Sequence, residues 1–294
     1  MLINEITGYC DDQYSSINTK IKCDDCTKTK GCTSCKDCLT EIHYNIPGGK
    51  NDYDCKNLIN FYVCDYSFKY ASEILYLLRQ SQKIKEISTY HITSIGCGAC
   101  PDLMAFESYV NETDPSKAIS YLGIDINELW KPIHNKIKEY DSKIIYKTRF
   151  RYDDAFKYLD QMIIKDANVL ILQYIISHFY NTGKIGQLDT FFDELIHGIV
   201  KHKNNDMPFI VIINDVNSNN RGRDYFLELR TKLKEADFHG CATQYYFDYN
   251  LKSEHQRYGI CHKSNDILYE IPFGFDKYEP WEHCSSAQLL LEIY

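Results

Sequence analysis

Residues 91–103 read HITSIGCGACPDL, and this stretch carries two different signals. An apolar run that predicts a strand leads directly into Gly96 and Gly98, as in the tight turn of a nucleotide-binding loop. Cys97 and Cys100 are spaced C-x-x-C, which is typical of thiol redox sites and metal knuckles. The stretch therefore predicts either a cofactor cradle or a thiol site, and the surrounding sequence has to separate the two.

Short apolar runs alternate with helical patterns downstream of this turn. The predicted strands are 91–95, 119–124, 144–148, 168–174, 209–214, 243–249 and 266–271, and the predicted helices are 102–109, 130–140, 185–202 and 224–236. Strict alternation indicates parallel strands joined by right-handed crossovers. The last two strands have no helix between them, so we expect the final strand to be antiparallel, as an edge hairpin. The sequence predicts an α/β fold with a doubly wound, seven-stranded, mostly parallel sheet.

Acidic residues follow the second and third predicted strands. Asp125 lies at the end of YLGID, where a carboxylate can accept two hydrogen bonds from ribose hydroxyls. Asp153 and Asp154 follow the third strand, where a side chain can meet the edge of an adenine. The alternative for each carboxylate is a cap on the turn or helix that comes next.

Taken together, IGCGACPDL, GIDIN, DDAF and the buried strand ending at Gln173 resemble the motif series of class I S-adenosylmethionine-dependent methyltransferases, over about residues 90–275. The family's sheet has seven strands with the last antiparallel, in agreement with the strand count above. The resemblance implies S-adenosylmethionine as cofactor, with the glycines at its methionine part, Asp125 at the ribose, Asp154 and Ala155 at the adenine, and Ile126 against the adenine face. The implied cofactor residues are Ser94, Gly96, Cys97, Gly98, Asp102, Asp125, Ile126, Asp154, Ala155 and Gln173. Many members have a third glycine, or an acidic residue before the turn; here those positions are Cys100 and Ser94.

Methyl transfer is an in-line displacement that the protein promotes mainly by aligning the nucleophile, with a base where the acceptor carries a proton. The candidate catalytic residues at the ends of the fourth and fifth strands are Tyr174, His178 and Asp215. His178 is either a base or a surface residue. An Asn/Asp-Pro-Pro-Tyr motif is absent at 173–176, and no cysteine follows the fourth strand. The methyl acceptor stays open among RNA, protein and small molecules.

Eight of the 13 cysteines lie within residues 1–64. The run CDDCTKTKGCTSCKDC predicts a metal site built from Cys23, Cys26, Cys32, Cys35 and Cys38. Zinc is the commonest metal for such thiolate pairs, and an iron-sulfur cluster is the alternative. His43, Cys55 and Cys64 leave the ligand set ambiguous. We expect a cysteine-rich zinc-binding module at 1–53, a helical connector and lid at 54–89, and the methyltransferase domain at 90–294.

Charge and hydropathy limit the partners and the location. The net charge of −8 does not favour nucleic-acid binding, although a local basic surface is compatible with it. The first residues lack the pattern of a signal peptide, and no apolar run reaches the length of a membrane span. We therefore expect a cytoplasmic protein without a membrane partner. Two other functions stay open: a non-catalytic scaffold that uses the metal module to bind a partner, and a thiol oxidoreductase built on Cys97 and Cys100.

Overall fold

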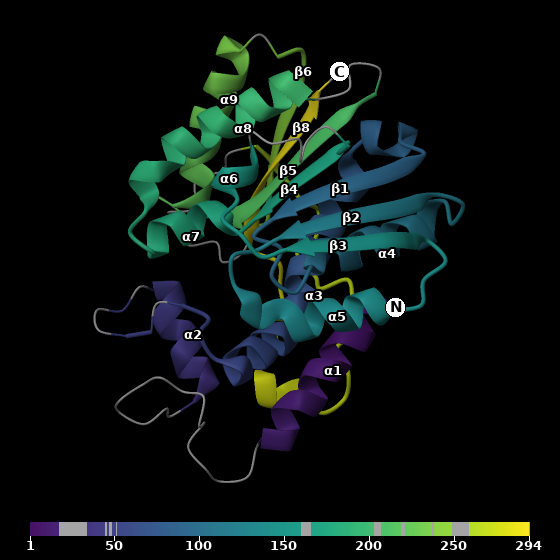
Figure 1. The fold of residues 1–294 in the computed structure, drawn as a ribbon, viewed down its shortest axis with the longest axis vertical. Coiled ribbons are helices and arrows are strands. Elements are labelled where there is room, and N and C mark those ends of the chain that lie inside the picture. Colours follow the sequence, from purple (N-terminus) through teal and green to yellow (C-terminus); the bar gives the residue numbers. More distant parts are fainter. Residues whose placement is uncertain are drawn as a thin grey trace.

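The computed structural model describes residues 1–17, 34–44, 46, 49–50, 52–159, 166–202, 207–218, 221–236, 238–248 and 259–293. Within these residues a sheet of eight strands has helices on both faces (Figure 1). The strands are β1 (Thr89–Ile95), β2 (Ala118–Ile124), β3 (Ile145–Arg151), β4 (Val169–Gln173), β5 (Phe209–Val216), β6 (Gly240–Tyr246), β7 (Ile260–Cys261) and β8 (Ser286–Ile293). Their order across the sheet is β3-β2-β1-β4-β5-β8-β6-β7.

Strands β1 to β5 are mutually parallel, which confirms the doubly wound prediction. β4 and β5 are almost wholly buried, as expected for strands covered on both faces. The chain runs outward from β1 through β2 to β3 and then returns to place β4 on the other side of β1. The strand order thus reverses beside β1, and ligands of such sheets bind at that point, beyond the carboxyl ends of the strands.

The C-terminal strands differ from the prediction. The antiparallel strand is β8, and it lies between β5 and β6 instead of forming an edge hairpin. The predicted strand at 266–271 is wrong, because this segment has only one isolated bridge, from Asp266 to His283. Its backbone is satisfied elsewhere: the Leu268 N–H donates to Ser72 Oγ, at 2.8 Å. Two observed strands lie outside the predicted ones: β8 and the two-residue β7, which pairs parallel with β6.

The helices form one group on each face of the sheet. They are α1 (Leu2–Ile17), α2 (Cys35–Tyr44), α3 (Lys56–Gln80), α4 (Pro101–Thr113), α5 (Lys131–Glu139), α6 (Phe156–Leu159), α7 (Ile175–Asn181), α8 (Leu188–His202) and α9 (Phe226–Glu235). Buried residues of α1 to α5 share one hydrophobic cluster, and those of α7, α8 and α9 share the other. α3 is one continuous helix within the predicted helical connector. None of the described helices combines the length and the apolar character needed to cross a membrane.

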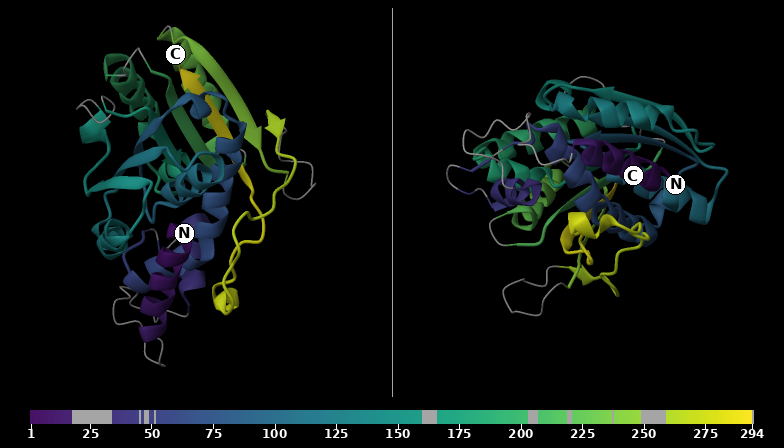
Figure 2. Two further views of the ribbon diagram at one scale, coloured as in Figure 1. Left: turned by 90° about the vertical axis from the view of Figure 1, so that its right-hand side faces the viewer. Right: turned by 90° about the horizontal axis from the view of Figure 1, so that it is seen from below.

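The N-terminal helices pack into the body of the protein. α1 lies against α3 and α5, away from the C-terminus (Figure 2), and buries Leu2, Ile3 and Ile6 completely. Cys35 and Cys38 lie on α2 and are both buried. The other cysteines of the predicted metal site, Cys23, Cys26 and Cys32, lie outside the described residues. The boundaries of the three predicted regions stay a prediction.

Candidate functional site

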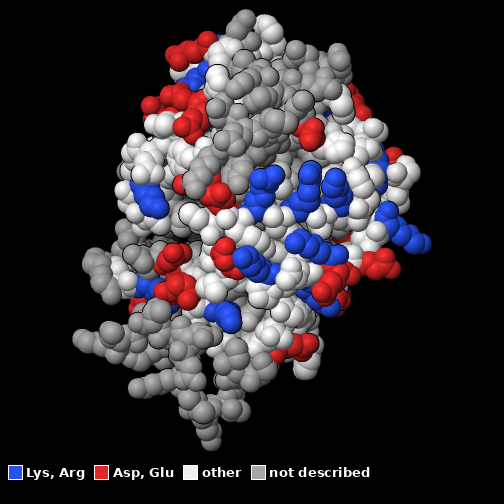
Figure 3. All heavy atoms as spheres, in the orientation of Figure 1, with Lys and Arg blue, Asp and Glu red and all other residues white. Residues whose placement is uncertain are grey.

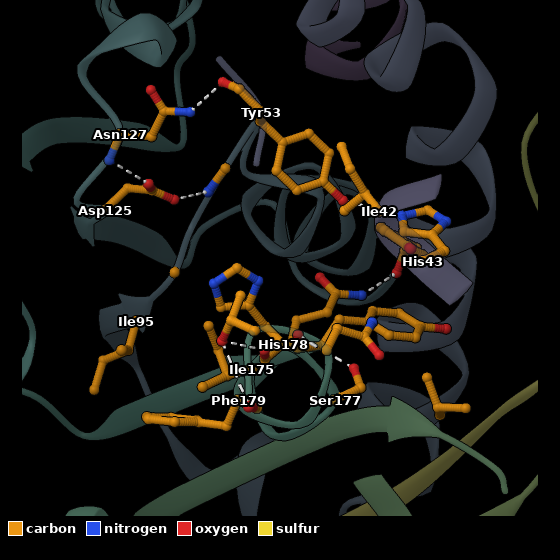
Figure 4. A pocket seen from close by; sticks show the side chains of 18 of the residues that line it. Ile42, His43, Tyr53, Ile95, Asp125, Asn127, Ile175, Ser177, His178 and Phe179 are labelled. Atoms are coloured by element: carbon orange, nitrogen blue, oxygen red, sulfur yellow. Dashed lines mark hydrogen bonds between the residues drawn. The ribbon is translucent and has the colours of Figure 1, made fainter. Parts of the chain in front are cut away.

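A cavity of about 620 Å³ opens at the carboxyl ends of β1, β2 and β4, where the strand order reverses. Two of its walls face each other. One is the glycine turn after β1 together with residues 124–127 at the end of β2; the other comes from α2, α3 and the loop at Trp281. Residues of α6, α7 and the end of β5 also line the cavity. Figure 4 shows Asp125 and Asn127 on the first side and Ile42 and His43 on the other.

The glycine turn is fixed to the neighbouring strand by its backbone. The N–H groups of Gly96 and Cys97 both donate to the carbonyl oxygen of Ile124, at 2.7 and 3.1 Å. Gly96 has a φ of +65° and Gly98 one of +48°, in the left-handed region. A Cβ on Gly96 would lie 2.0 Å from Cδ1 of Ile175. Glycine is therefore favoured at position 96 by its left-handed conformation, and a side chain there would have to displace the end of the Ile175 side chain.

Asp125 holds this turn and faces the cavity. Its Oδ2 accepts the Gly98 N–H at 2.9 Å, and its Oδ1 accepts the Asn127 N–H, also at 2.9 Å (Figure 4). Burial raises the pKa of this carboxyl group. The next side chain, Ile126, is 70% exposed and also lines the cavity. The end of β2 thus offers one oriented carboxylate beside one exposed apolar side chain.

The acidic pair after β3 lies at the same cavity. Asp153, Asp154 and Ala155 all contribute to its lining. Oδ1 of Asp154 accepts the Phe156 N–H at 3.0 Å, which caps the start of α6. Asp154 therefore caps the helix, as the alternative prediction had it, and also lines the cavity.

Ser94, Cys97 and Asp102 do not line this cavity; they lie behind the turn and are buried. The Tyr121 hydroxyl donates to both carboxylate oxygens of Asp102, at 2.9 and 3.2 Å. Burial raises the pKa of Asp102 to about 6. The backbone of the glycine turn can therefore contact a ligand in the cavity directly. The three side chains support the turn from its opposite side.

Cys97, Cys100 and His134 form a buried cluster whose possible metal-ligating atoms all lie within 4.8 Å of one another. His134 already has a partner at each ring nitrogen, since Nε2 lies 2.7 Å from the Gly98 carbonyl oxygen and Nδ1 lies 2.8 Å from the Tyr152 hydroxyl. Its ring stacks on Phe150 with centroids 3.9 Å apart. In this arrangement the histidine supports the glycine turn from α5.

The predicted catalytic residues are separated by the structure. Tyr174 and His178 line the cavity, whereas Asp215 is fully buried outside it. The Asp215 carboxylate accepts the N–H groups of Ile176 and Ser177, at 2.8 and 3.2 Å, so it caps α7 from the end of β5. Burial raises its pKa to about 6. We assign Asp215 to positioning α7, with its lone pairs engaged by backbone.

Tyr174 and His178 differ in their chemistry. The Tyr174 hydroxyl donates to Oε2 of Glu73 at 2.8 Å, and its ring stacks on Tyr70 with centroids 4.2 Å apart. Burial, and then the Glu73 charge, raise the pKa of Tyr174 well above its usual range. Burial lowers the pKa of His178. At neutral pH the cavity therefore holds a neutral phenol with a fixed direction and a neutral imidazole.

Sequence reasoning missed the second wall, which we call the aromatic wall. Its members are Tyr53, Tyr62, Tyr66, Tyr70, Trp130, Tyr174 and Trp281. His43 is held between two of these phenols, with Nε2 3.0 Å from the Tyr53 hydroxyl and Nδ1 2.9 Å from the Tyr66 hydroxyl. Burial, followed by the nearby charges of Lys69 and Lys36, lowers its pKa to about 4. Both nitrogens of this possible metal ligand are thus engaged by tyrosines.

A buried charged pair lies beneath the aromatic wall. Lys69 is 5% exposed and Glu73 fully buried, with 3.9 Å between Nζ and Oε1. Lys69 Nζ also lies 4.1 Å from the centroid of the Trp281 ring and lines the cavity. The signal that could have revealed the pair is its i,i+4 spacing within the predicted helical connector, with Asp65 one further turn before Lys69 on the same face.

Basic side chains gather outside the cavity, over β3 and α5 (Figure 3). Lys147, Arg149 and Arg151 alternate along β3 and are exposed. None of the three lines the cavity. The acidic net charge of −8 therefore coexists with a local basic surface.

Comparison with known proteins gave similarities to solved structures only, because no family model and no curated protein matches the chain. The plantazolicin methyltransferase BpumL in complex with SAH is 14% identical, with 98% of each chain covered and a TM-score of 0.45. The plantazolicin methyltransferase BamL, in complex with a triazolic desmethylPZN analog and SAH, is 12% identical, with 87% of this chain and 94% of that chain covered and a TM-score of 0.45. A cyclopropane-fatty-acyl-phospholipid synthase-like protein from Lactobacillus casei is 9% identical, with 78% and 92% covered and a TM-score of 0.42. At these identities and scores, the function has to be argued from the site itself.

Proposed function

We propose that this chain is an S-adenosylmethionine-dependent methyltransferase whose acceptor is still to be identified. The observation that carries the proposal is the placement of Asp125: a carboxylate at the end of β2, hydrogen-bonded to the Gly98 N–H and facing a cavity at the point where the strand order reverses. A carboxylate there is suited to the two hydroxyls of a ribose. The sequence resemblance and the geometry support the same assignment independently.

The remaining lining residues fit the other parts of this cofactor. Ile126 is exposed toward the cavity and suits the adenine face, with Asp154 and Ala155 beside it. The backbone of Gly96 and Gly98 suits the methionine part, since neither residue has a side chain to block its approach. When bound, the cofactor supplies a methyl group carried by a sulfonium cation. Aromatic faces stabilise cations of this kind, and the aromatic wall borders the same cavity.

The chain's own residues contribute alignment and proton transfer. Tyr174, fixed by Glu73 and stacked on Tyr70, shapes the cavity and orients an acceptor group. His178, neutral at neutral pH, can accept the proton that an acceptor loses on methylation. The aromatic side chains of α3 give this side of the cavity an apolar surface.

We also propose that the cysteine-rich segment binds zinc. Cys35 and Cys38 are one turn apart on α2, so both thiols lie on the same side of the helix, as required of ligands to one ion. Elemental analysis of the purified protein tests this: we expect zinc in stoichiometric amount. Iron would indicate the cluster alternative, and the absence of both metals would contradict a metal site.

Methyl transfer is tested by incubating the protein with S-adenosylmethionine labelled in the methyl group and with fractions of cell extract. We expect label to appear in one acceptor class with the wild-type protein and to be strongly reduced with Asp125→Ala. A protein that binds the cofactor but labels no fraction would support the scaffold function instead. The thiol oxidoreductase alternative concerns a different activity, thiol oxidoreduction. Loss of that activity in Cys97→Ser, with its retention in Asp125→Ala, would favour this alternative.

A further inference from the structure

We infer that Lys69 forms a binding site for a carboxylate inside the cavity, belonging either to the cofactor's amino-acid end or to the acceptor. The inference rests on the proposed function and extends it, because it assigns a charge preference to the side of the cavity that α3 lines. Lys69 is 5% exposed, and it lines the cavity from the middle of α3.

The ammonium group of Lys69 has donors without acceptors. In the described part of the chain, no oxygen lies within hydrogen-bond distance of Nζ, and its nearest carboxylate oxygen is Glu73 Oε1, at 3.9 Å. Its close neighbours are ring faces: the Trp281 centroid at 4.1 Å, Tyr70 at 5.6 Å and Tyr174 at 5.7 Å. A buried ammonium without an acceptor is costly, so the donors are suited to a ligand that supplies one.

Glu73 does not satisfy this need, because its oxygens are used by other donors. Oε2 accepts the Tyr174 hydroxyl and the Asn214 side-chain amide, at 2.8 and 2.9 Å. Oε1 accepts the backbone N–H groups of Ser285 and Ser286, at 3.0 and 3.2 Å. Four hydrogen bonds thus stabilise the charge of Glu73.

The other nearby carboxylate is Asp65, one turn before Lys69. Its Oδ2 pairs with Lys36 Nζ at 3.2 Å, whereas its buried Oδ1 has no hydrogen-bond partner in the described part of the chain. Neither Asp65 oxygen lies within hydrogen-bond distance of Lys69 Nζ. Burial lowers the pKa of Lys69, and the charge of Glu73 acts in the opposite direction. An anion arriving from the cavity would further favour the protonated lysine.

The size of the charge selects a carboxylate over a phosphate. The site offers one ammonium group, whose charge the Glu73 carboxylate 3.9 Å away already offsets. A carboxylate with a single negative charge therefore leaves less uncompensated charge in this buried place than a phosphate close to −2. The flanking Trp281 and Tyr70 rings add apolar surface for the group that bears the carboxylate.

The test compares two adenosine thioethers, S-adenosylhomocysteine and 5′-methylthioadenosine, which lacks the amino-acid end. Dissociation constants are measured by calorimetry for the wild-type protein, Lys69→Met and, as a matched control, Lys83→Met, which removes an exposed lysine paired with Glu86 on the surface. Phenylacetate is then titrated into protein saturated with S-adenosylhomocysteine. Thermal melts establish that each variant is folded.

Two results support the inference and identify the source of the carboxylate. If the carboxylate belongs to the cofactor, Lys69→Met raises the dissociation constant of S-adenosylhomocysteine at least tenfold and leaves that of 5′-methylthioadenosine unchanged. If it is the acceptor's, both thioethers bind as in the wild type, and phenylacetate binds to the wild type but not to Lys69→Met. Lys83→Met behaves as wild type in either case.

The inference is overturned if Lys69→Met changes neither the ratio of the dissociation constants of the two thioethers nor the binding of phenylacetate. If Lys69→Met does not fold, binding measurements on the wild-type protein alone still test the inference. Equal affinity for S-adenosylhomocysteine and its carboxamide, together with no binding of phenylacetate, would then overturn it. A wild type that binds neither thioether contradicts the proposed function instead, so the two failures are distinguishable.

Discussion

The two walls of the cavity are built by different means. The glycine turn uses backbone N–H groups and one carboxylate, all from the ends of adjacent parallel strands. The aromatic wall uses side chains from the segment before α3, from α3, from the turns after β2 and β4, and from the Trp281 loop. These segments are distant in sequence and meet only through tertiary packing. The glycine turn is suited to binding one fixed ligand, the cofactor. The shape and chemistry of the aromatic wall select the acceptor that fits beside it. Each wall should therefore respond differently to mutation.

The largest effect is expected beneath the aromatic wall, at Glu73. Glu73→Ala removes the acceptor for Tyr174, Asn214 and two backbone N–H groups and leaves Lys69 without its nearest counter-charge. Breaking a buried pair of this kind costs roughly 3–5 kcal/mol. Urea unfolding should show this loss, whereas Glu86→Ala on the surface should change the free energy of unfolding by no more than about 0.5 kcal/mol. A loss below about 1 kcal/mol at Glu73 would contradict the role given to this network.

At the glycine turn, the expected change is in binding more than in stability. Asp125→Ala should weaken S-adenosylhomocysteine by about 100-fold, because two charge-assisted hydrogen bonds to a ribose are worth about 3 kcal/mol together. Calorimetric titration measures this directly. Asp125→Asn keeps the shape and one acceptor, so its loss should be intermediate. Unchanged affinity in Asp125→Ala would remove the main support for the cofactor site.

The same division explains what could be predicted from the sequence. Gly96, Gly98 and Asp125 could be placed because strand ends are local features and parallel strands bring them to one edge. Lys69 and Tyr66 were placed on a helix, but their periodicity does not say which cavity they face. β8 was missed because its position between β5 and β6 depends on pairing with strands far away in the chain. The segment 266–271 has strand-like alternation, but it lies against α3 and binds Ser72 instead of a sheet neighbour.

The pH dependence of stability tests the packing of His43 in the aromatic wall. Its pKa is about 4 in the folded protein against 6.5 for the free side chain, so the unfolded chain binds the extra proton between these values. Its contribution is complete above pH 6.5 and is lost as the pH falls toward 4. Relative to His43→Gln, the wild type should lose about 2 kcal/mol between pH 7 and pH 5.

The quantity to compare is the difference in the free energy of unfolding between the wild type and His43→Gln at each pH. Burial raises the pKa values of Asp65, Asp102 and Asp215, to about 7, 6 and 6, which stabilises the fold as the pH falls and opposes His43. These contributions are shared by both proteins and cancel in the difference. Parallel stability curves for wild type and His43→Gln would show that His43 is not held neutral by its burial between the two tyrosines.

The smallest effect is expected where the two walls meet. The Asn127 side-chain amide donates to the Tyr53 carbonyl oxygen at 2.7 Å, and its Oδ1 accepts the Leu129 N–H at 3.0 Å. Asn127→Ala should lower the free energy of unfolding by about 1 kcal/mol, the usual value for a partly buried hydrogen bond. Asn181→Ala is the matched control, because it removes an amide at the cavity whose Oδ1 has no hydrogen-bond partner in the described part of the chain. Equal losses in the two variants would mean that Asn127 does not link the walls.

The central claim is that the cavity beside β1 holds S-adenosylmethionine. Calorimetric titration of the wild-type protein with S-adenosylhomocysteine, the product left after methyl transfer, tests it most directly. We expect one molecule bound per chain, with affinity strongly reduced in Asp125→Ala. Absence of binding by the folded wild-type protein would contradict the account.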